Sequence, residues 1–196
     1  MIAEDKLVVT DTRDWAVTTD QGQPLISINR GFSAPVKIDR DLDLDALLAL
    51  TRVENDPFNQ WDSFQSLMMD DLLSVAYGET DTPNLALIEA LAETARGRFD
   101  DPAFAALLIR LPTIADLFQA HTPADPQALK HAQNQALQAL GAALQDDIAR
   151  TLEAPSPTPF APTAEQSGIR ALRAAMITLL AHDQSNDSEA RLKQLY

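Results

Sequence analysis

The helical character of this protein is clearest in residues 56–77, which read DPFNQWDSFQSLMMDDLLSVAY. The stretch opens with Asp-Pro, an N-cap residue followed by proline at the first helical position, which is a common way to begin a helix. Large apolar side chains then recur every three or four residues, as one face of an α-helix requires. They are Trp61, Phe64, Met68, Leu72 and Val75. The pattern predicts a helix over 57–77, with Trp61 and Phe64 in the core.

The same kind of helix start recurs along the chain from Leu42 onward. Thr82-Pro83, Asp101-Pro102 and Asp125-Pro126 each precede an apolar stripe. The stripes comprise Leu85, Ile88, Ala92 and Ala95, and then Leu129, Gln133, Ala136, Leu140, Leu144 and Ile148. Short connections between such segments favour antiparallel neighbours. The expected fold class is therefore mainly α, an array of antiparallel helical hairpins stacked as in an α-α superhelix.

The last quarter of the chain begins with a proline-rich connector. Residues 155–162 read PSPTPFAP, and four prolines there exclude a helix because they remove donors and restrict the preceding residues. Thr163 and Gln166 then have the spacing of a capping box, which predicts another amphipathic helix. A final helix is expected from Asp187, and it has barely two turns before Tyr196. Such a short helix has little apolar surface, so we expect the domain to continue beyond it.

The first forty residues have a different pattern. Three runs rich in β-branched or aromatic residues are separated by turn residues and predict short strands: Lys6–Thr10, Trp15–Thr19 and Leu25–Ile28. So few short strands do not form a stable sheet domain alone. We therefore expect residues 1–38 to be the remnant of a truncated β-sandwich linker domain. Residues 39–196 would then form the N-terminal part of a helical domain that is itself cut short.

Composition narrows the classes of function. The 196 residues include 15 basic and 29 acidic side chains, and the net charge of −14 disfavours nucleic acid as a partner. No stretch approaches the roughly 20 apolar residues of a membrane helix, and the N-terminus lacks the pattern of a secretory signal. The chain has no cysteine, which fits a reducing compartment. The cytoplasm is the expected location.

The motifs that carry metal chemistry are missing from the sequence. The three histidines, His121, His131 and His182, are dispersed, and no His-Glu-x-x-His occurs. Four alternating aspartates could suggest a calcium loop: Asp39, Asp41, Asp43 and Asp45. That loop requires glycine at its sixth position and glutamate at its twelfth, and neither is present in either register. We interpret these aspartates as caps of the following helix.

Nucleophilic and acid–base motifs are missing as well. Ser33 lies in Gly31-Phe32-Ser33-Ala34-Pro35, where a nucleophile elbow would need glycine in place of Pro35. Carboxylates are numerous, but nothing in the sequence brings two of them together, so they indicate a solvated acidic face. We assign no catalytic, cofactor-binding or metal-binding residue.

Three stretches resemble a known family. Residues 30–37, RGFSAPVK, resemble the segment of bacterial-type aminopeptidase N, a gluzincin zinc metallopeptidase, that leads from a small β-sandwich domain into the C-terminal helical domain. Residues 55–62, NDPFNQWD, with Gln65-Ser66-Leu67 after them, resemble the first helical hairpin of that domain. Leu111-Pro112 and Asp125-Pro126 resemble its later helices. The resemblance extends from about Leu7 to the chain end.

The resemblance implies a non-catalytic fragment of a larger enzyme. The zinc ligands, the motif that binds the substrate amine and the catalytic tyrosine of the family belong to an upstream domain and have no counterpart here. The parent would bind zinc and remove N-terminal amino acids from peptides, whereas this fragment would bind no cofactor. Its partners would be the upstream catalytic domain of the same polypeptide and peptide substrates. The helical domain would enclose the active site and restrict substrate access.

Two other interpretations remain open. A free-standing helical adaptor would bind a partner protein on its concave face, although no fixed period of about 33 to 47 residues recurs in the sequence. A small acidic hydrolase with an unrecognised carboxylate site is the third.

Overall fold

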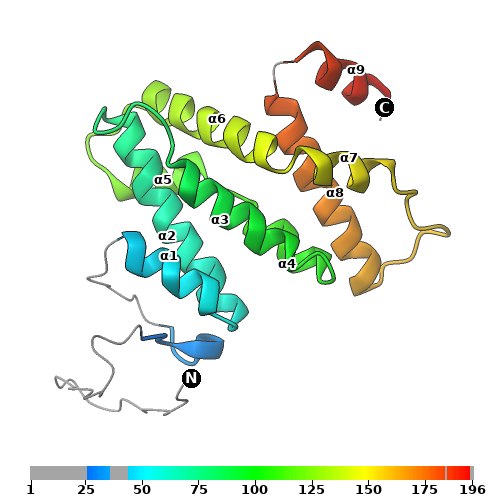
Figure 1. Ribbon diagram of the computed structural model, residues 1–196, viewed down its shortest axis with the longest axis horizontal. Helices are drawn as coiled ribbons and strands as arrows, with labels where there is room; N and C mark the ends of the chain where they lie inside the picture. The colour runs from blue at the N-terminus through cyan, green and yellow to red at the C-terminus, as the bar shows by residue number, and fades with distance from the viewer. Residues whose placement is uncertain (1–25, 36–43, 184, 195–196) are drawn as a thin grey trace.

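The computed structural model describes residues 26–35, 44–183 and 185–194, and its regular elements in these ranges are all helical. The helices form an elongated array (Figure 1), which confirms the mainly α fold class. After a single 3-10 turn at Arg30–Phe32, the α-helices are α1 (Leu44–Val53), α2 (Pro57–Ala76), α3 (Leu85–Arg96), α4 (Pro102–Leu108), α5 (Ile114–Ala120), α6 (Pro126–Ala143), α7 (Gln145–Glu153), α8 (Ala164–His182) and α9 (Asn186–Gln194).

Helix α2 forms where the sequence predicted it. The Asp56 carboxylate accepts a hydrogen bond of 3.0 Å from the backbone N–H of Asn59 and so caps the first turn. Phe64 is fully buried, as predicted. Trp61 is only half-buried, because it lies at the edge of the apolar face and packs against the ring of Phe58 at 6.2 Å between centroids. Its place in the core is therefore corrected to the rim.

The first half of the array is built around α2, α3 and α6. Both α2 and α3 pack on α6, while α1 covers α2 and α3 from the other side. The apolar faces of these helices meet in one continuous core with the faces of α4, α5 and α8. Its largest fully buried side chains are Phe64, Met68, Leu72, Leu87, Leu91, Leu108, Ile109, Leu117, Leu129, Leu140, Leu144 and Met176.

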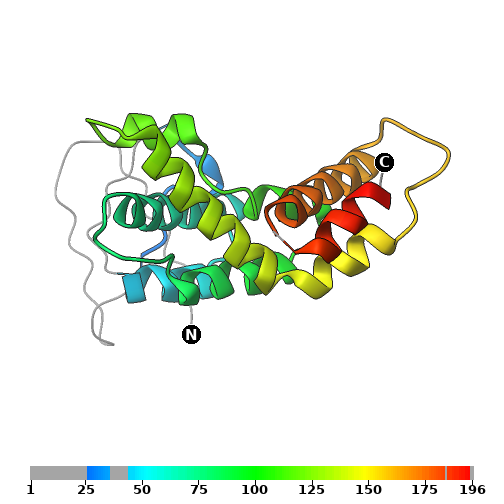
Figure 2. The same cartoon turned by 90° about the horizontal axis from the view of Figure 1, so that it is seen from above.

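The second half depends on α8, which crosses the array and packs against α4, α6 and α7 (Figure 2). Two glycines allow this close approach. A Cβ added at Gly168 would lie 3.0 Å from the backbone nitrogen of Ala103 in α4, and one at Gly141 would lie 3.3 Å from the carbonyl oxygen of Leu179. Any larger residue at either glycine would push α8 away from its neighbour.

One predicted helix is in fact two. The stripe from Leu129 to Ile148 runs through α6 and α7, which meet at Leu144 with φ −103° and ψ 15°. Arg96 of α3 bridges this junction, because its guanidinium donates to the carbonyl of Ala143 and, at 2.8 Å, to the buried carboxylate of Asp147. The hydrogen bond to that carboxylate raises the pKa of Arg96. The contact lies 51 residues apart in sequence, so the stripe alone could not show the break.

Two helix starts also differ from their predictions. Helix α3 begins at Leu85 with Asn84 as its cap, so Thr82-Pro83 only precedes it, and Leu85 is 69% exposed rather than part of the core. At α8, Thr163 caps the Gln166 amide as predicted, but the Gln166 side chain bonds to the preceding loop instead of completing a capping box. Residues 155–162 are not helical, as expected.

Helix α9 packs against α8, and a tight turn sets its start. The Asp183 carboxylate accepts hydrogen bonds from the hydroxyl groups of Ser188 and Ser185, which lower the pKa of Asp183. Ser188 is buried and Leu192 is half-buried against the core. The short final helix is therefore present and docked.

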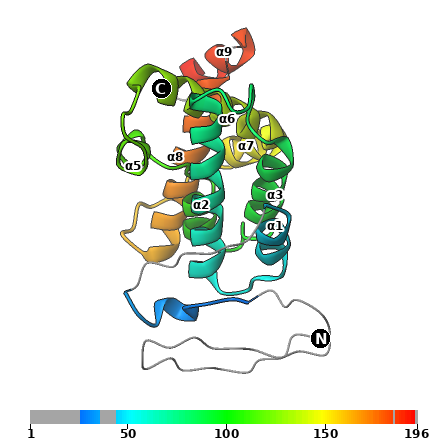
Figure 3. The same cartoon turned by 90° about the vertical axis from the view of Figure 1, so that its left-hand side faces the viewer.

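The predicted strands are not confirmed. The runs 6–10 and 15–19, like the aspartates before α1, lie outside the described residues. In the third run, residues 26–28 have no regular secondary structure, because their chain follows the end of the α1–α2 hairpin and bonds to side chains there (Figure 3). Within the described ranges, the β part of the expected fold class is thus replaced by an irregular segment.

We expect Phe64→Ala to lower the free energy of unfolding by about 3–5 kcal/mol, through lost burial and a residual cavity. Urea unfolding followed by circular dichroism measures this change. Leu85→Ala is the matched control, because its side chain is mostly exposed and should change stability by less than about 0.5 kcal/mol. Equal losses for the two variants would contradict the described core.

Gly168→Ala should destabilise the chain by about 1–3 kcal/mol, because the new methyl group would collide with the backbone of α4. Gly97→Ala serves as the control. Gly97 has helical φ and ψ, and the nearest atom to its added Cβ is 3.4 Å away, so alanine there should be neutral or stabilising by up to about 1 kcal/mol. Thermal unfolding of both variants tests whether α8 depends on the close approach.

Candidate functional site: a polar joint at the first helical hairpin

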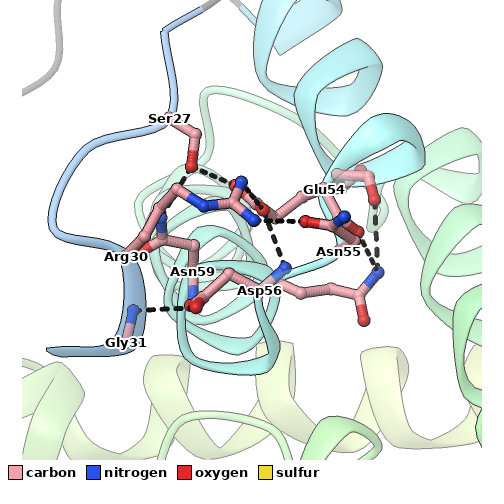
Figure 4. Close-up of polar contacts among 9 residues, drawn as sticks. Ser27, Arg30, Gly31, Glu54, Asn55, Asp56 and Asn59 are labelled. Atoms are coloured by element: carbon pink, nitrogen blue, oxygen red, sulfur yellow. Dashed lines mark hydrogen bonds and ion pairs between the residues drawn. The ribbon is translucent and has the colours of Figure 1, made fainter. Parts of the chain in front are cut away.

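The most extensive polar cluster of the described residues joins the segment 26–35 to the α1–α2 hairpin. Its centre is Glu54, in the turn between the two helices, with only 1% of its side chain exposed. The carboxylate accepts hydrogen bonds from the Ser27 hydroxyl group, from Nη1 of Arg30 at 2.9 Å and from the Asp56 amide at 2.8 Å (Figure 4). We call this cluster of Ser27, Arg30, Gly31 and residues 54–56, 59 and 60 the polar joint.

Further hydrogen bonds extend the polar joint on the side of the segment. Arg30 also donates to the Asn55 side chain, and the Gly31 amide donates to Oδ2 of Asp56 at 2.7 Å. Nδ2 of Asn59 donates to the Ser27 hydroxyl oxygen at 2.8 Å. Since Oδ1 of Asp56 caps α2, one carboxylate both starts the helix and holds the segment. Loss of the Asp56 carboxylate would therefore weaken both the start of α2 and the attachment of the segment 26–35.

The segment itself is a compact turn. Three residues have positive φ, namely Asn29 at 59°, Gly31 at 65° and Phe32 at 50°. The Asn29 side-chain oxygen accepts from the Ala34 amide at 2.9 Å and from the Ser33 hydroxyl group at 3.0 Å, which closes the turn. Positive φ strains residues with a side chain and favours glycine and asparagine. The motif RGFSAP is thus the sequence of a turn that presents Arg30 and the Gly31 amide to the hairpin.

The joint continues into the body of the array through Gln60. This buried side chain donates from Nε2 to the Glu54 carbonyl at 3.2 Å, and its Oε1 accepts from Nε of Arg98 at 3.1 Å. Arg98 follows α3, and its guanidinium carbon lies 5.5 Å from the ring centroid of Phe104 in α4. Helix α2, the end of α3 and helix α4 are thereby connected to the turn at Glu54, which holds the segment 26–35.

An apolar surface lies beside the polar joint. The rings of Phe32 and Phe58 are 4.8 Å apart and continue to Trp61. Phe32 remains 53% exposed, and Val53 remains 55% exposed. Ile26 and Ile28 of the segment are also exposed. Exposed apolar side chains grouped in this way are typical of a surface that contacts another protein region.

The chemistry of the polar joint is structural. Its buried carboxylate is surrounded by donors, which is how a protein stabilises a charge away from water. Ser33, which the sequence analysis rejected as a nucleophile, donates its hydroxyl proton to Asn29, and no base contacts it in the described structure. The arrangement can hold two parts of a polypeptide at a fixed angle.

The histidines do not converge on a metal site. The ring of His121 stacks on that of Tyr77 at 4.0 Å, His131 contacts Gln135, and His182 contacts the carbonyl of Thr178. Among residues 26–35, 44–183 and 185–194, no three His, Asp or Glu side chains are placed to bind a metal ion. The described part of the chain therefore does not fit zinc.

None of the helices in the described part of the chain is long and apolar enough to cross a membrane.

Sequence reasoning found only part of the polar joint. It identified Asp56 as a helix cap and residues 30–37 and 55–62 as family resemblances, but it assigned no contact to Glu54, Ser27 or Asn59. Their partners lie 24 to 32 residues away. The one available signal was the group of polar residues 54–56 directly before Pro57, which is more than a single cap requires.

The described residues form a helical array whose first hairpin is joined to the segment 26–35 by hydrogen bonds. Residues 44–196 match the family model described as "Domain of unknown function (DUF3458_C) ARM repeats", and the chain belongs to this family. The family description contains repeats, although the sequence showed no fixed period.

Relatives of this chain are aminopeptidases. Aminopeptidase N of Caulobacter vibrioides is 34% identical over 210 residues, which cover 98% of this chain and 24% of the relative. Aminopeptidase N of Escherichia coli is 27% identical, over 84% of this chain and 19% of the relative. The resemblance to aminopeptidase N is thus confirmed, and the chain spans about a quarter or less of these relatives.

A solved structure shares the fold. Aminopeptidase A of Legionella pneumophila, determined in complex with aspartic acid, superposes with a TM-score of 0.69 at 20% identity. The match covers 89% of this chain and 21% of that one. At this identity the likeness concerns the fold alone.

Glu54→Gln should lower the free energy of unfolding by about 1–3 kcal/mol, because the amide leaves donors of the joint without an acceptor. Glu89→Gln is the matched control: Glu89 is 54% exposed and 3.3 Å from Arg96, so its loss should cost less than about 0.5 kcal/mol. Hydrogen exchange of the Gly31 amide should accelerate in Glu54→Gln only. Unchanged Gly31 exchange would contradict the joint.

Proposed function

We propose that this chain is the helical, non-catalytic part of an aminopeptidase that removes N-terminal amino acids from peptides. The observation that carries the proposal is the similarity to aminopeptidase N along 98% of the chain. The matched part is 24% of that relative, so the reaction would take place in the remainder of a longer polypeptide. In that polypeptide, zinc would supply the Lewis acid for peptide hydrolysis.

The proposal divides the chain into two parts. Residues 1–38 belong to a β-sandwich linker domain, and residues 39–196 form the first part of a C-terminal helical domain. The polar joint supports this division, because it attaches the segment 26–35 to the α1–α2 hairpin through a buried carboxylate. The exposed side chains of Phe32 and Val53 then contact the rest of the linker domain, outside residues 26–35. The joint would thus set the direction in which the array extends.

The array would restrict access to the active site and would take no part in the hydrolysis itself. A helical array held over an active site excludes bulk water and large substrates, which confines hydrolysis to peptides small enough to enter. Its partners are the catalytic domain of the same polypeptide and the peptide substrates. The absence of cysteine supports the cytoplasm as the location.

Comparing two purified proteins tests the division of labour. We expect the polypeptide that contains this chain to bind about one zinc ion and to hydrolyse alanyl and leucyl anilides. The 196-residue chain, checked for helicity by circular dichroism, should do neither. A tightly bound zinc ion on the 196-residue chain would overturn its non-catalytic role. A longer polypeptide without peptidase activity would favour the adaptor instead.

A second measurement tests restricted access. The longer polypeptide should cleave a short peptide about 100-fold more efficiently, in kcat/KM, than a folded protein with the same N-terminal residue, because the protein cannot reach an enclosed site. The same protein carrying a flexible 20-residue N-terminal extension is the control for steric access. Equal kcat/KM for the peptide and the folded protein would contradict enclosure.

A further inference from the structure

The loop between α7 and α8 projects from the array at the end opposite the segment 26–35 (Figures 1 and 2). It carries Phe160, whose side chain is 71% exposed. No other large hydrophobic side chain of the described residues is as exposed. A phenyl ring held in water forgoes the free energy of burial. The ring is therefore available for contact with another surface.

The backbone around Phe160 is held in place. Oε1 of Gln166 accepts a hydrogen bond of 2.8 Å from the Ala161 amide, and Nε2 of the same side chain donates to the Pro159 carbonyl at 3.1 Å. These bonds fix the chain on both sides of the ring. The prolines of residues 155–162 restrict φ along the rest of the loop. The backbone that carries the ring thus has little conformational entropy left to lose on binding.

Arg170 makes a cation–π contact with the Phe160 ring. Its guanidinium carbon lies 4.7 Å from the ring centroid of Phe160, so one face of the ring is covered and the remainder stays open. Neither Arg170 nor the nearby Arg173 forms an ion pair with another described residue. Arg173 instead donates to the carbonyls of Thr151 and Ala154. Arg170 thus carries a positive charge that pairs with no described carboxylate, in a chain with a net charge of −14.

We propose that Phe160 and Arg170 form a docking knob for the rest of the longer aminopeptidase polypeptide. The phenyl ring inserts into an apolar pocket there, and Arg170 pairs with a carboxylate at the rim of that pocket. Aromatic and arginine side chains that are fixed before binding supply much of the energy of protein interfaces. The unpaired charge of Arg170 selects an acidic rim by complementarity.

This inference rests on the proposed function and extends it. An array attached only at the polar joint could swing away from an active site, because a single contact at one end leaves the other end free. The docking knob supplies a second attachment at the far end. Relatives such as the Caulobacter enzyme contain about three quarters of their length outside the matched part, which provides a surface for it.

A photocrosslinking experiment on the whole polypeptide locates the partner of the knob. In one variant Phe160→benzoylphenylalanine introduces the photoreactive group, and in the matched control Leu85→benzoylphenylalanine places it at another exposed apolar position, which is 69% exposed and has no arginine stacked on it. We expect irradiation of the first variant to give an intramolecular cross-link to a segment outside residues 1–196. The control should not reach that segment.

Charge variants test the role of Arg170 in the same experiment. Arg170→Glu should lower the yield of the cross-link about tenfold or more, whereas Arg170→Lys should retain most of it, because only the former repels an acidic rim. Hydrolysis of alanyl anilide by each variant shows whether the polypeptide is an aminopeptidase.

The outcomes separate the two proposals. A polypeptide with no peptidase activity overturns the proposed function, and the docking knob with it. An active polypeptide whose position 160 cross-links only to residues 154–173, to a second copy, or to nothing overturns the knob alone. An equal yield from Arg170→Glu and Arg170→Lys overturns the acidic rim.

Discussion

The close approach of α8 to α4 and α6 is the constraint on which the architecture depends. At Gly168 an added Cβ would lie 3.0 Å from the backbone of Ala103, and at Gly141 it would lie 3.3 Å from the carbonyl of Leu179. Helices that approach this closely fill the space between them with backbone and small side chains. Because α8 also contacts α7, its position determines where the second half of the array packs against the first.

Buried carboxylates hold two of the places where one helix ends and the next begins, the α1–α2 turn and the α6–α7 junction. Glu54 accepts hydrogen bonds from the segment 26–35 and from the start of α2. Asp147 forms ion pairs with two arginines beside the junction of α6 and α7. Removing a carboxylate from water is unfavourable unless donors replace the lost hydration. Each carboxylate therefore stabilises only the arrangement that brings its donors together. The two clusters thus specify angles between elements that apolar packing alone would leave adjustable.

Local signals predicted most helices but not the repeat. Asp-Pro starts a helix at Asp56, Asp101 and Asp125, where each carboxylate accepts from amides of the first turn. The family description contains ARM repeats, yet the sequence shows no period. Successive helices differ in length, with 20 residues in α2, 12 in α3 and 7 in α4. Helices of such different lengths give no fixed spacing along the chain.

The sequence by itself determined the helical fold class, the helix-start signals, the absence of a zincin motif and the resemblance to aminopeptidase N. These depend on residues within about four positions of one another or on short motifs, so they can be read along the chain. Only the tertiary structure decided that Trp61 lies at the rim of the core and that one helix ends and another begins at Leu144. It also decided that Glu54 pairs with Arg30 and that Phe160 stays exposed. Each depends on what lies beside a residue in space. In the case of Arg96 and Asp147, the partner is 51 residues away, beyond the reach of any local pattern.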